Sequence, residues 1–156
     1  MHSEDAEFIL RLLNTQKWKQ YVSDRGIDTN EKAIDFLEAS IIPSYDKLGF
    51  GFYLIEKKED HEAVGICGLV RREGLDDIDI GYALLPEYEG NGFALEAAQA
   101  TLEWGFTTHH LTRILAITDQ KNTQSISLLK KLGMNFTGLV QLPSDAKKLM
   151  LFSLTK

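Results

Sequence analysis

The sequence predicts an α+β fold in which helices flank a mixed, mostly antiparallel central sheet. Two observations carry this prediction. Amphipathic helical spacing in the first third of the chain gives way to three apolar segments joined by short turns, the pattern of an antiparallel meander. A glycine-containing loop then leads into a long helix and another apolar strand, which indicates a parallel crossover. The 156 residues have the length of one domain, so we expect a single domain over 1–156.

Three helices are expected before the sheet. Apolar residues at helical spacing predict the first over Glu4–Asn14, and a shorter one follows over Thr15–Val22. The third covers about 28–44 and starts from an aspartate or a threonine that can cap it. Pro43 is expected to kink or end this helix, because proline lacks the N–H that a helix interior needs.

Strands alternate with turns and helices in the rest of the chain. Short turns separate the first three strands, so we expect antiparallel hairpins. Near the end, Asn122 caps a helix that Gly133 terminates. The other expected elements are the strands Gly51–Lys57, Ala63–Arg71 and Asp77–Leu84, the helix Phe93–Phe106, and the strands Arg113–Thr118, Phe136–Leu139 and Lys148–Leu154.

Composition limits the class of protein without identifying one. The formal net charge of −6 argues against non-specific nucleic-acid binding, which needs a basic face. Cys67 is the one cysteine, so no internal disulfide is expected, and its apolar neighbours favour a small core residue over a nucleophile. The histidines lack metal-ligand spacing, no apolar run is long enough to span a membrane, and the N-terminus lacks signal-peptide features. We therefore expect no metal, no membrane partner and a cytoplasmic location.

The loop between the third strand and the long helix carries the strongest functional signal. Gly90 and Gly92 remove side chains where backbone N–H groups can point outward. The helix that starts at Phe93 adds unpaired N–H donors and a partial positive charge, and this combination suits a diphosphate. The third glycine of a dinucleotide fingerprint is missing, and no Lys-Ser or Lys-Thr pair follows as in a P-loop. On its own, a Gly-x-Gly turn is also common before ordinary helices.

Two motifs together resemble the GNAT acetyltransferases. The segment Glu89-Gly90-Asn91-Gly92-Phe93-Ala94 is similar to motif A, Gln/Arg-x-x-Gly-x-Gly/Ala, with matching glycine and alanine positions but Glu at the first position. The spacing Asn122-x-x-Ser125, followed by Leu132-Gly133-Met134-x-Phe136, resembles motif B in the form common in the RimJ/RimL-like branch. The order and separation of the motifs also match the family.

The resemblance implies the GNAT fold and transfer of an acetyl group from acetyl-CoA to a primary amine, by direct attack in a ternary complex. The acceptor would be a protein N-terminal α-amine or a small-molecule amine. Family members commonly begin with a strand before the first helix, whereas this sequence starts almost at that helix, and a homodimer would be one way to cover the exposed sheet edge. The implied cofactor-binding residues are Ala83, Leu84 and Leu85, with a backbone N–H of Leu84 or Leu85 stabilising the oxyanion, then Gly90, Asn91, Gly92, Phe93, Ala94, Leu95 and Asn122.

Two residues are candidates for proton transfer. Some family members carry a tyrosine on the motif B helix that acts as the general acid. The matching position here is Leu129, so the resemblance suggests Ser125 as the catalytic acid instead. The alternative for Ser125 is a helix residue that bonds to backbone or solvent. Asp79 stands where related proteins often carry Glu and can act as general base, directly or through water. The alternative is a solvent-facing strand residue or a partner of Arg71 or Arg72.

Two other functions stay open on the sequence alone. A non-catalytic acyl-CoA-binding or interaction module would keep the loop and lose turnover, which Glu89, the missing tyrosine and the missing first strand allow. A nucleotide-binding α/β protein would bind ATP or NAD instead. The hairpins ahead of the glycine loop argue against this last class, because doubly wound folds alternate strands and helices from the start.

Overall fold

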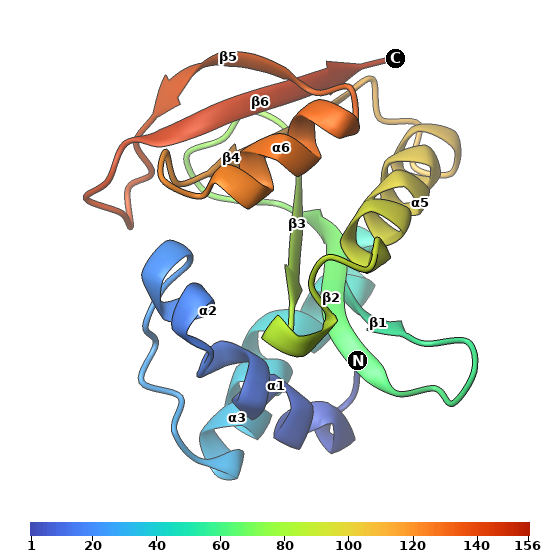
Figure 1. Cartoon of the computed structure of the whole chain (residues 1–156), viewed down its shortest axis with the longest axis vertical. Coiled ribbons are helices and arrows are strands. Elements are labelled where there is room, and N and C mark those ends of the chain that lie inside the picture. Colours follow the sequence, from blue (N-terminus) through green and yellow to red (C-terminus); the bar gives the residue numbers. More distant parts are fainter. The chain divides into compact units, whose positions relative to one another are not determined.

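The computed structural model describes all residues 1–156 and has a six-stranded mixed sheet with strand order β1-β2-β3-β4-β6-β5 (Figure 1). The predicted α+β class is therefore confirmed. The strands are β1 (Phe52–Glu56), β2 (Ala63–Val70), β3 (Asp79–Leu84), β4 (Arg113–Thr118), β5 (Asn135–Val140) and β6 (Leu149–Thr155). The helical elements are η1 (Ser3–Asp5), α1 (Ala6–Leu13), α2 (Gln16–Tyr21), α3 (Asn30–Phe36), η2 (Leu37–Ile41), α4 (Ile42–Leu48), η3 (Pro86–Tyr88), α5 (Phe93–Thr107) and α6 (Thr123–Lys131).

The chain forms two compact units. The first unit comprises Met1–Gly68 and Tyr82–Ala94, and the second comprises Leu69–Gly81 and Leu95–Lys156. The chain passes from one unit to the other within β2, within β3 and near the start of α5. The expectation of a single domain over 1–156 stays a prediction.

Helix α1 supplies much of the core of the first unit. Its buried residues recur at spacings of three and four, which places them on one helical face. That face packs with residues of α3 and η2, with one residue of β2 and with the residue that follows β3. The buried members of this core are Ala6, Ile9, Leu12, Leu13, Ala33, Leu37, Ile41, Ile66 and Leu85.

The helical segment after Thr29 runs further than the sequence predicts. The Thr29 side chain accepts a hydrogen bond from the Lys32 N–H at 3.3 Å and caps α3, as expected. A π-helical turn, η2, then leads into α4, which ends only at Gly49 with φ 77°. The alternative that Pro43 ends the helix is therefore wrong, and the other alternative, that Pro43 kinks it, stays a prediction. Pro43 lies in the first turn of α4, directly after η2, where no regular i→i−4 hydrogen bond is lost by its missing N–H.

The end of this helical segment is fastened to β1. The Tyr45 hydroxyl donates a hydrogen bond to the Phe52 carbonyl, and its ring stacks on that of Tyr53 with centroids 5.1 Å apart. Burial raises the pKa of Tyr45 to about 12. The phenol therefore stays protonated and can donate this hydrogen bond throughout the neutral range.

Strands β1 and β2 pair antiparallel, so the first predicted hairpin is confirmed. Gly65 on β2 allows a close backbone approach within the first unit. A Cβ at this position would lie 2.4 Å from the Ala83 carbonyl oxygen and 2.5 Å from a Leu84 methyl carbon. Cys67 on the same strand is buried in the core, as the apolar run predicts.

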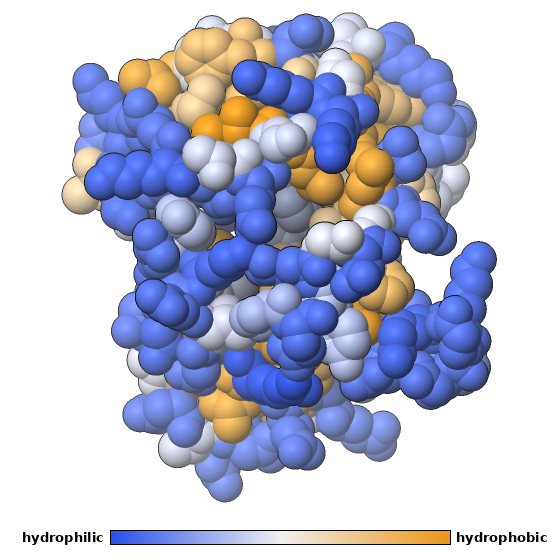
Figure 2. All heavy atoms as spheres, in the orientation of Figure 1, coloured by the Kyte–Doolittle hydropathy of each residue, from blue (hydrophilic) through white to orange (hydrophobic).

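The second unit contains the predicted parallel crossover. Strand β4 pairs parallel with β3 at Asp79 and Leu115, and antiparallel with β6, whose other neighbour is β5. Helix α6 lies against this part of the sheet (Figure 1). Hydrophobic atoms on the face drawn in Figure 2 gather mainly over this unit. On the edge strand β5, Phe136 and Leu139 are each 52% exposed.

Candidate functional site

The end of β3 is fixed by a backbone hydrogen bond within the first unit. Leu85, directly after the strand, is buried, and its N–H donates to the Val64 carbonyl at 2.9 Å. The short 3-10 turn η3 follows and carries the chain to Glu89. The Leu85 N–H therefore already has an acceptor, and the role of Leu84 or Leu85 as oxyanion donor stays a prediction.

The loop after η3 has the backbone conformation that its glycines make possible. Gly90 and Gly92 have φ values of 78° and 84°, in the left-handed region that favours glycine. A Cβ at either position would meet no atom within 4 Å, so the conformation and not crowding requires glycine there. The Asn91 amide donates to the Tyr88 and Glu89 carbonyls at 3.4 and 3.2 Å. The Asn91 side chain is thus bonded to the backbone just before it in the chain. Helix α5 begins at Phe93.

Two ion pairs join this loop region to the N-terminal helices of the first unit. Arg11 on α1 pairs with Glu87 in η3, and Lys17 on α2 pairs with Glu89. The side chains of the first pair are 59% and 43% exposed, whereas those of the second are 44% and 25% exposed. The partners lie 76 and 72 residues apart in sequence, so no local pattern could have indicated either pair.

A polar cluster from the β1–β2 turn also contacts η3. The Tyr88 hydroxyl donates to the Glu62 carboxylate, and Lys57 pairs with Glu62 at 2.6 Å and with Asp60 at 3.0 Å. Hydrogen bonds from Lys57 and Tyr88 to the Glu62 carboxylate lower its pKa, and the bond from Lys57 has the larger effect. The Tyr88 ring also meets the Phe93 ring edge-on at 6.3 Å. Within the first unit, the segment leading into the glycine loop is thus bonded both to the N-terminal helices and to the β1–β2 turn.

Asp79 is one of the two buried polar or charged residues of the protein, with a side chain only 1% exposed. Its Oδ2 lies 3.2 Å from the Arg72 Nε, and its Oδ1 is buried without a hydrogen-bond partner. Burial raises the pKa of Asp79 above its ordinary value of 3.8, and the Arg72 charge opposes this shift. The solvent-facing alternative is therefore wrong, and the pairing with Arg72 is confirmed. A role as general base stays a prediction.

Helix α6 begins as the sequence predicts. The Asn122 side-chain oxygen accepts a hydrogen bond from the Ser125 N–H at 3.2 Å, so Asn122 is the N-cap. Ser125 lies half-buried in the first turn. Leu129, at the position where some family members carry tyrosine, is 1% exposed and belongs to the core. The contacts of Asn122 and Ser125 with a cofactor stay predictions.

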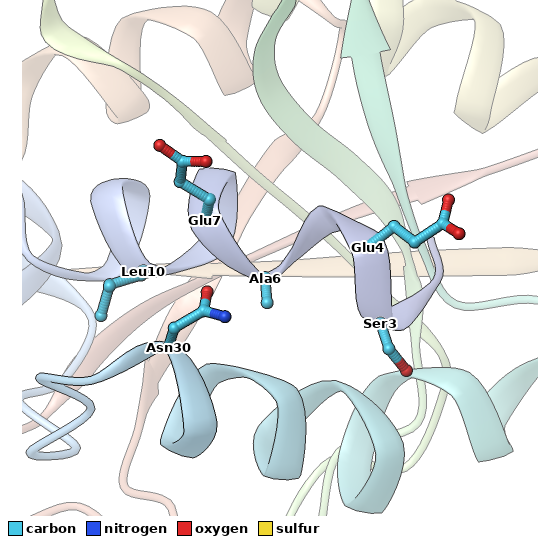
Figure 3. A pocket seen from close by; sticks show the side chains of 6 residues that line it. All are labelled: Ser3, Glu4, Ala6, Glu7, Leu10 and Asn30. Carbon is cyan, nitrogen blue, oxygen red and sulfur yellow. The ribbon is translucent and has the colours of Figure 1, made fainter.

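A shallow cavity of about 370 Å³ lies between α1 and α3, away from the glycine loop. In Figure 3 the Glu4 and Glu7 carboxylates point away from α3, whereas Ala6 and Leu10 face it. No predicted site residue lines this cavity, whose lining residues are Ser3, Glu4, Ala6, Glu7, Leu10 and Asn30. The structure contains no group of three or more His, Cys, Asp or Glu side chains placed to hold a metal ion. It also contains no helix long and apolar enough to cross a bilayer.

Known proteins of similar sequence and structure include acetyltransferases. An uncharacterised N-acetyltransferase, p20, of Bacillus licheniformis is 31% identical over 162 residues that cover 100% of this chain and 90% of p20. The spermidine N(1)-acetyltransferase of Escherichia coli K12 is 38% identical over 139 residues, 88% of this chain and 72% of that enzyme. The crystal structure of ribosomal-protein-S5-alanine acetyltransferase from Vibrio fischeri matches with a TM-score of 0.81 at 21% identity, covering 99% of this chain and 90% of that one.

A match to the model of a known domain identifies the family of this chain. The model of the acetyltransferase (GNAT) domain matches residues 1–135, well over half of the chain. The matched range includes the glycine loop before α5 and the capped start of α6, the two segments that carry the family motifs. The chain therefore belongs to the GNAT acetyltransferases, a family of acetyl-CoA-dependent enzymes that acetylate amines.

Proposed function

We propose that this protein binds acetyl-CoA and transfers its acetyl group to a primary amine, by direct attack of the amine in a ternary complex, as a member of the RimJ/RimL-like branch. The left-handed glycine loop at the start of α5 is the observation that carries the cofactor assignment. Such a loop, followed by the N-terminus of a 15-residue helix, offers backbone N–H groups and a partial positive charge to a diphosphate.

The cofactor roles follow the chain through this segment. The backbone of Ala83, Leu84 and Leu85 would lie along the pantetheine arm. The Leu84 N–H would stabilise the oxyanion, since the Leu85 N–H is engaged by Val64. The diphosphate would bind to the loop residues Gly90, Asn91, Gly92, Phe93, Ala94 and Leu95, and Asn122 would contact the pantetheine arm while capping α6.

The chemical roles make modest demands on the side chains. Ser125 would donate a proton to the leaving thiolate, whose conjugate acid has a pKa of about 8.5, so little assistance is needed. Asp79 would accept a proton from the amine through water, because its own side chain is buried. Its raised pKa suits a base that works nearer neutral pH than an ordinary aspartate. An α-amine, with a pKa of about 7.7–8.0, demands less of this base than a lysine amine at about 10.4.

Two acceptor classes are supported by the named relatives. A polyamine is the acceptor in the name of the E. coli relative, and a ribosomal-protein alanine in that of the V. fischeri structure. We propose a primary amine of one of these two kinds for this protein. A homodimer and a cytoplasmic location stay predictions.

Isothermal titration with acetyl-CoA, beside ATP and NAD, tests the cofactor assignment. We expect micromolar binding of acetyl-CoA alone, and loss of that binding in Gly92→Trp. Gly26→Trp is the matched control, because Gly26 also has a left-handed φ, of 63°, and open space around its Cβ position, but lies outside the loop. A folded protein that does not bind acetyl-CoA would overturn the proposal.

Turnover is tested separately, by thiol release from acetyl-CoA in the presence of spermidine or of a peptide with an N-terminal alanine. Release with either acceptor supports the transferase. Binding of acetyl-CoA without release over a wide panel of amines would instead indicate a non-catalytic acyl-CoA-binding module.

A further inference from the structure

The first position of motif A carries a negative charge where the family carries glutamine or arginine. A lone carboxylate at Glu89 would repel a diphosphate bound at Gly90 and Gly92. The structure resolves this conflict, because the Glu89 carboxylate is paired with the Lys17 ammonium of α2. We propose that Lys17 is a phosphate-binding residue of the cofactor site, supplied from α2 and paired with Glu89. This inference rests on the acetyl-CoA site proposed above.

The exposure of the two side chains supports a role for the cation toward a ligand. The Glu89 side chain is 25% exposed and the Lys17 side chain is 44% exposed, so the lysine is the more accessible member of the pair. Glu89 directly precedes Gly90, which places the ammonium beside the loop. An ammonium has three donors, so it can keep its carboxylate partner and still donate to a phosphate oxygen. The pair therefore supplies the cation that the loop sequence itself lacks.

Two nearby cations provide contrasts. Arg11 pairs with Glu87 in η3, which is further from Gly90, and both side chains are more exposed than those of the Lys17 pair. Lys19 is an exposed residue of the same helix as Lys17 and lies two positions along it, so it points about 200° around the axis from Lys17. A general attraction of a negative ligand to positive charge would involve all three residues, whereas the proposed contact is specific to Lys17.

Binding of two acetyl donors by the full chain and its variants tests this contact. Acetyl-CoA contains the diphosphate, and S-acetylpantetheine does not. We expect Lys17→Met to weaken acetyl-CoA binding about tenfold, the loss of one charge-assisted hydrogen bond, and to leave S-acetylpantetheine binding unchanged. Lys19→Met is the matched control, with the same change of charge on the same helix and no expected effect on either donor.

Glu89→Gln is expected to change the affinity for acetyl-CoA in the opposite direction. It therefore separates a role of Lys17 in ligand binding from a role in anchoring α2. If Lys17 binds phosphate, removing the carboxylate leaves its charge to the ligand and removes a repulsion, so acetyl-CoA should bind about threefold more tightly. If the pair only anchors α2, both variants should weaken both donors, and that result would overturn the inference. Equal affinities of Lys17→Met and Lys19→Met for acetyl-CoA would also overturn it. Absence of acetyl-CoA binding by the unchanged protein would instead refute the proposed function, so the two failures are distinguishable.

Discussion

Removing the guanidinium beside Asp79 is expected to destabilise the protein in a pH-dependent way. Arg72→Met leaves a carboxylate that is 1% exposed without its 3.2 Å partner. At an effective dielectric constant of 20, the attraction across that distance is about 5 kcal/mol, an upper bound on the loss. Removing one partner of a fully buried pair typically costs about 3–5 kcal/mol. Because Arg72 is 31% exposed, water screens part of this pair, and we expect about 2–3 kcal/mol at pH 7.

The way in which this destabilisation changes with pH follows from the raised pKa of Asp79. The folded state holds the Asp79 proton more tightly than the unfolded state, whose ordinary pKa is 3.8. The contribution of Asp79 to stability is therefore full below pH 3.8 and is lost as the pH rises through the folded-state pKa. Without Arg72 this loss is larger. The destabilisation by Arg72→Met should thus be small near pH 3.5, below the ordinary value of 3.8, and larger near pH 7.

Urea unfolding of four proteins at these two pH values measures the effect. The set comprises the unchanged chain, Arg72→Met, Asp79→Asn and the double variant. In the Asp79→Asn background no buried charge is left, so adding Arg72→Met should cost less than about 1 kcal/mol. An Arg72→Met penalty that is equal at both pH values, or equal in both backgrounds, would refute the view that a buried, ionised Asp79 depends on Arg72.

Three further pairs of substitutions test the packing and capping described above. Gly65→Ala places a Cβ against the Ala83 carbonyl and should lower stability by about 3 kcal/mol in denaturant unfolding, whereas Gly26→Ala adds only backbone strain and should cost about 1 kcal/mol; equal costs would contradict the close approach. Asn122→Ala should cost about 1 kcal/mol through loss of the α6 cap, and Asn122→Asp should retain most of that stability, so a fully stable alanine variant would count against capping. Leu12→Ala removes a side chain with 0% exposure and should cost about 3–4 kcal/mol by thermal unfolding, against less than about 1 kcal/mol for Leu48→Ala at 39% exposure; similar losses would refute the assigned core.

Local signals account for the parts of the fold that the sequence predicts well. The bounds of β4 are those expected from its apolar run, and the glycine loop starts α5 at Phe93. Asn122 caps α6, and Gly133 ends it with φ 79°. Each of these features depends on residues within a few positions of one another, so caps, turns and hydrophobic periodicity are enough to indicate them.

Contacts between distant segments account for what the sequence does not predict. Strand alternation places Asp79 on one face of β3 but does not say whether that face is covered. The strand pairs in parallel with β4, and parallel strands are usually covered on both faces, which is consistent with the burial of this carboxylate. The Lys17–Glu89 pair joins residues 72 positions apart. A glutamate at the first position of motif A reads from the sequence alone as a departure from the family, and only its partner shows how the charge is balanced.

The π-helical turn η2 makes this helical segment tolerant of a change in length by one residue. A π turn holds one more residue than an α-helical turn, so it has the form of an insertion that the fold has absorbed in place. Deleting one residue between 37 and 41 would return the turn to α-helical geometry and leave the later side chains of the segment at their positions. Tyr45 would then keep its hydrogen bond to the Phe52 carbonyl, and the helix would keep its attachment to β1. An alignment of relatives should therefore admit a one-residue gap in this stretch with the Tyr45 position kept.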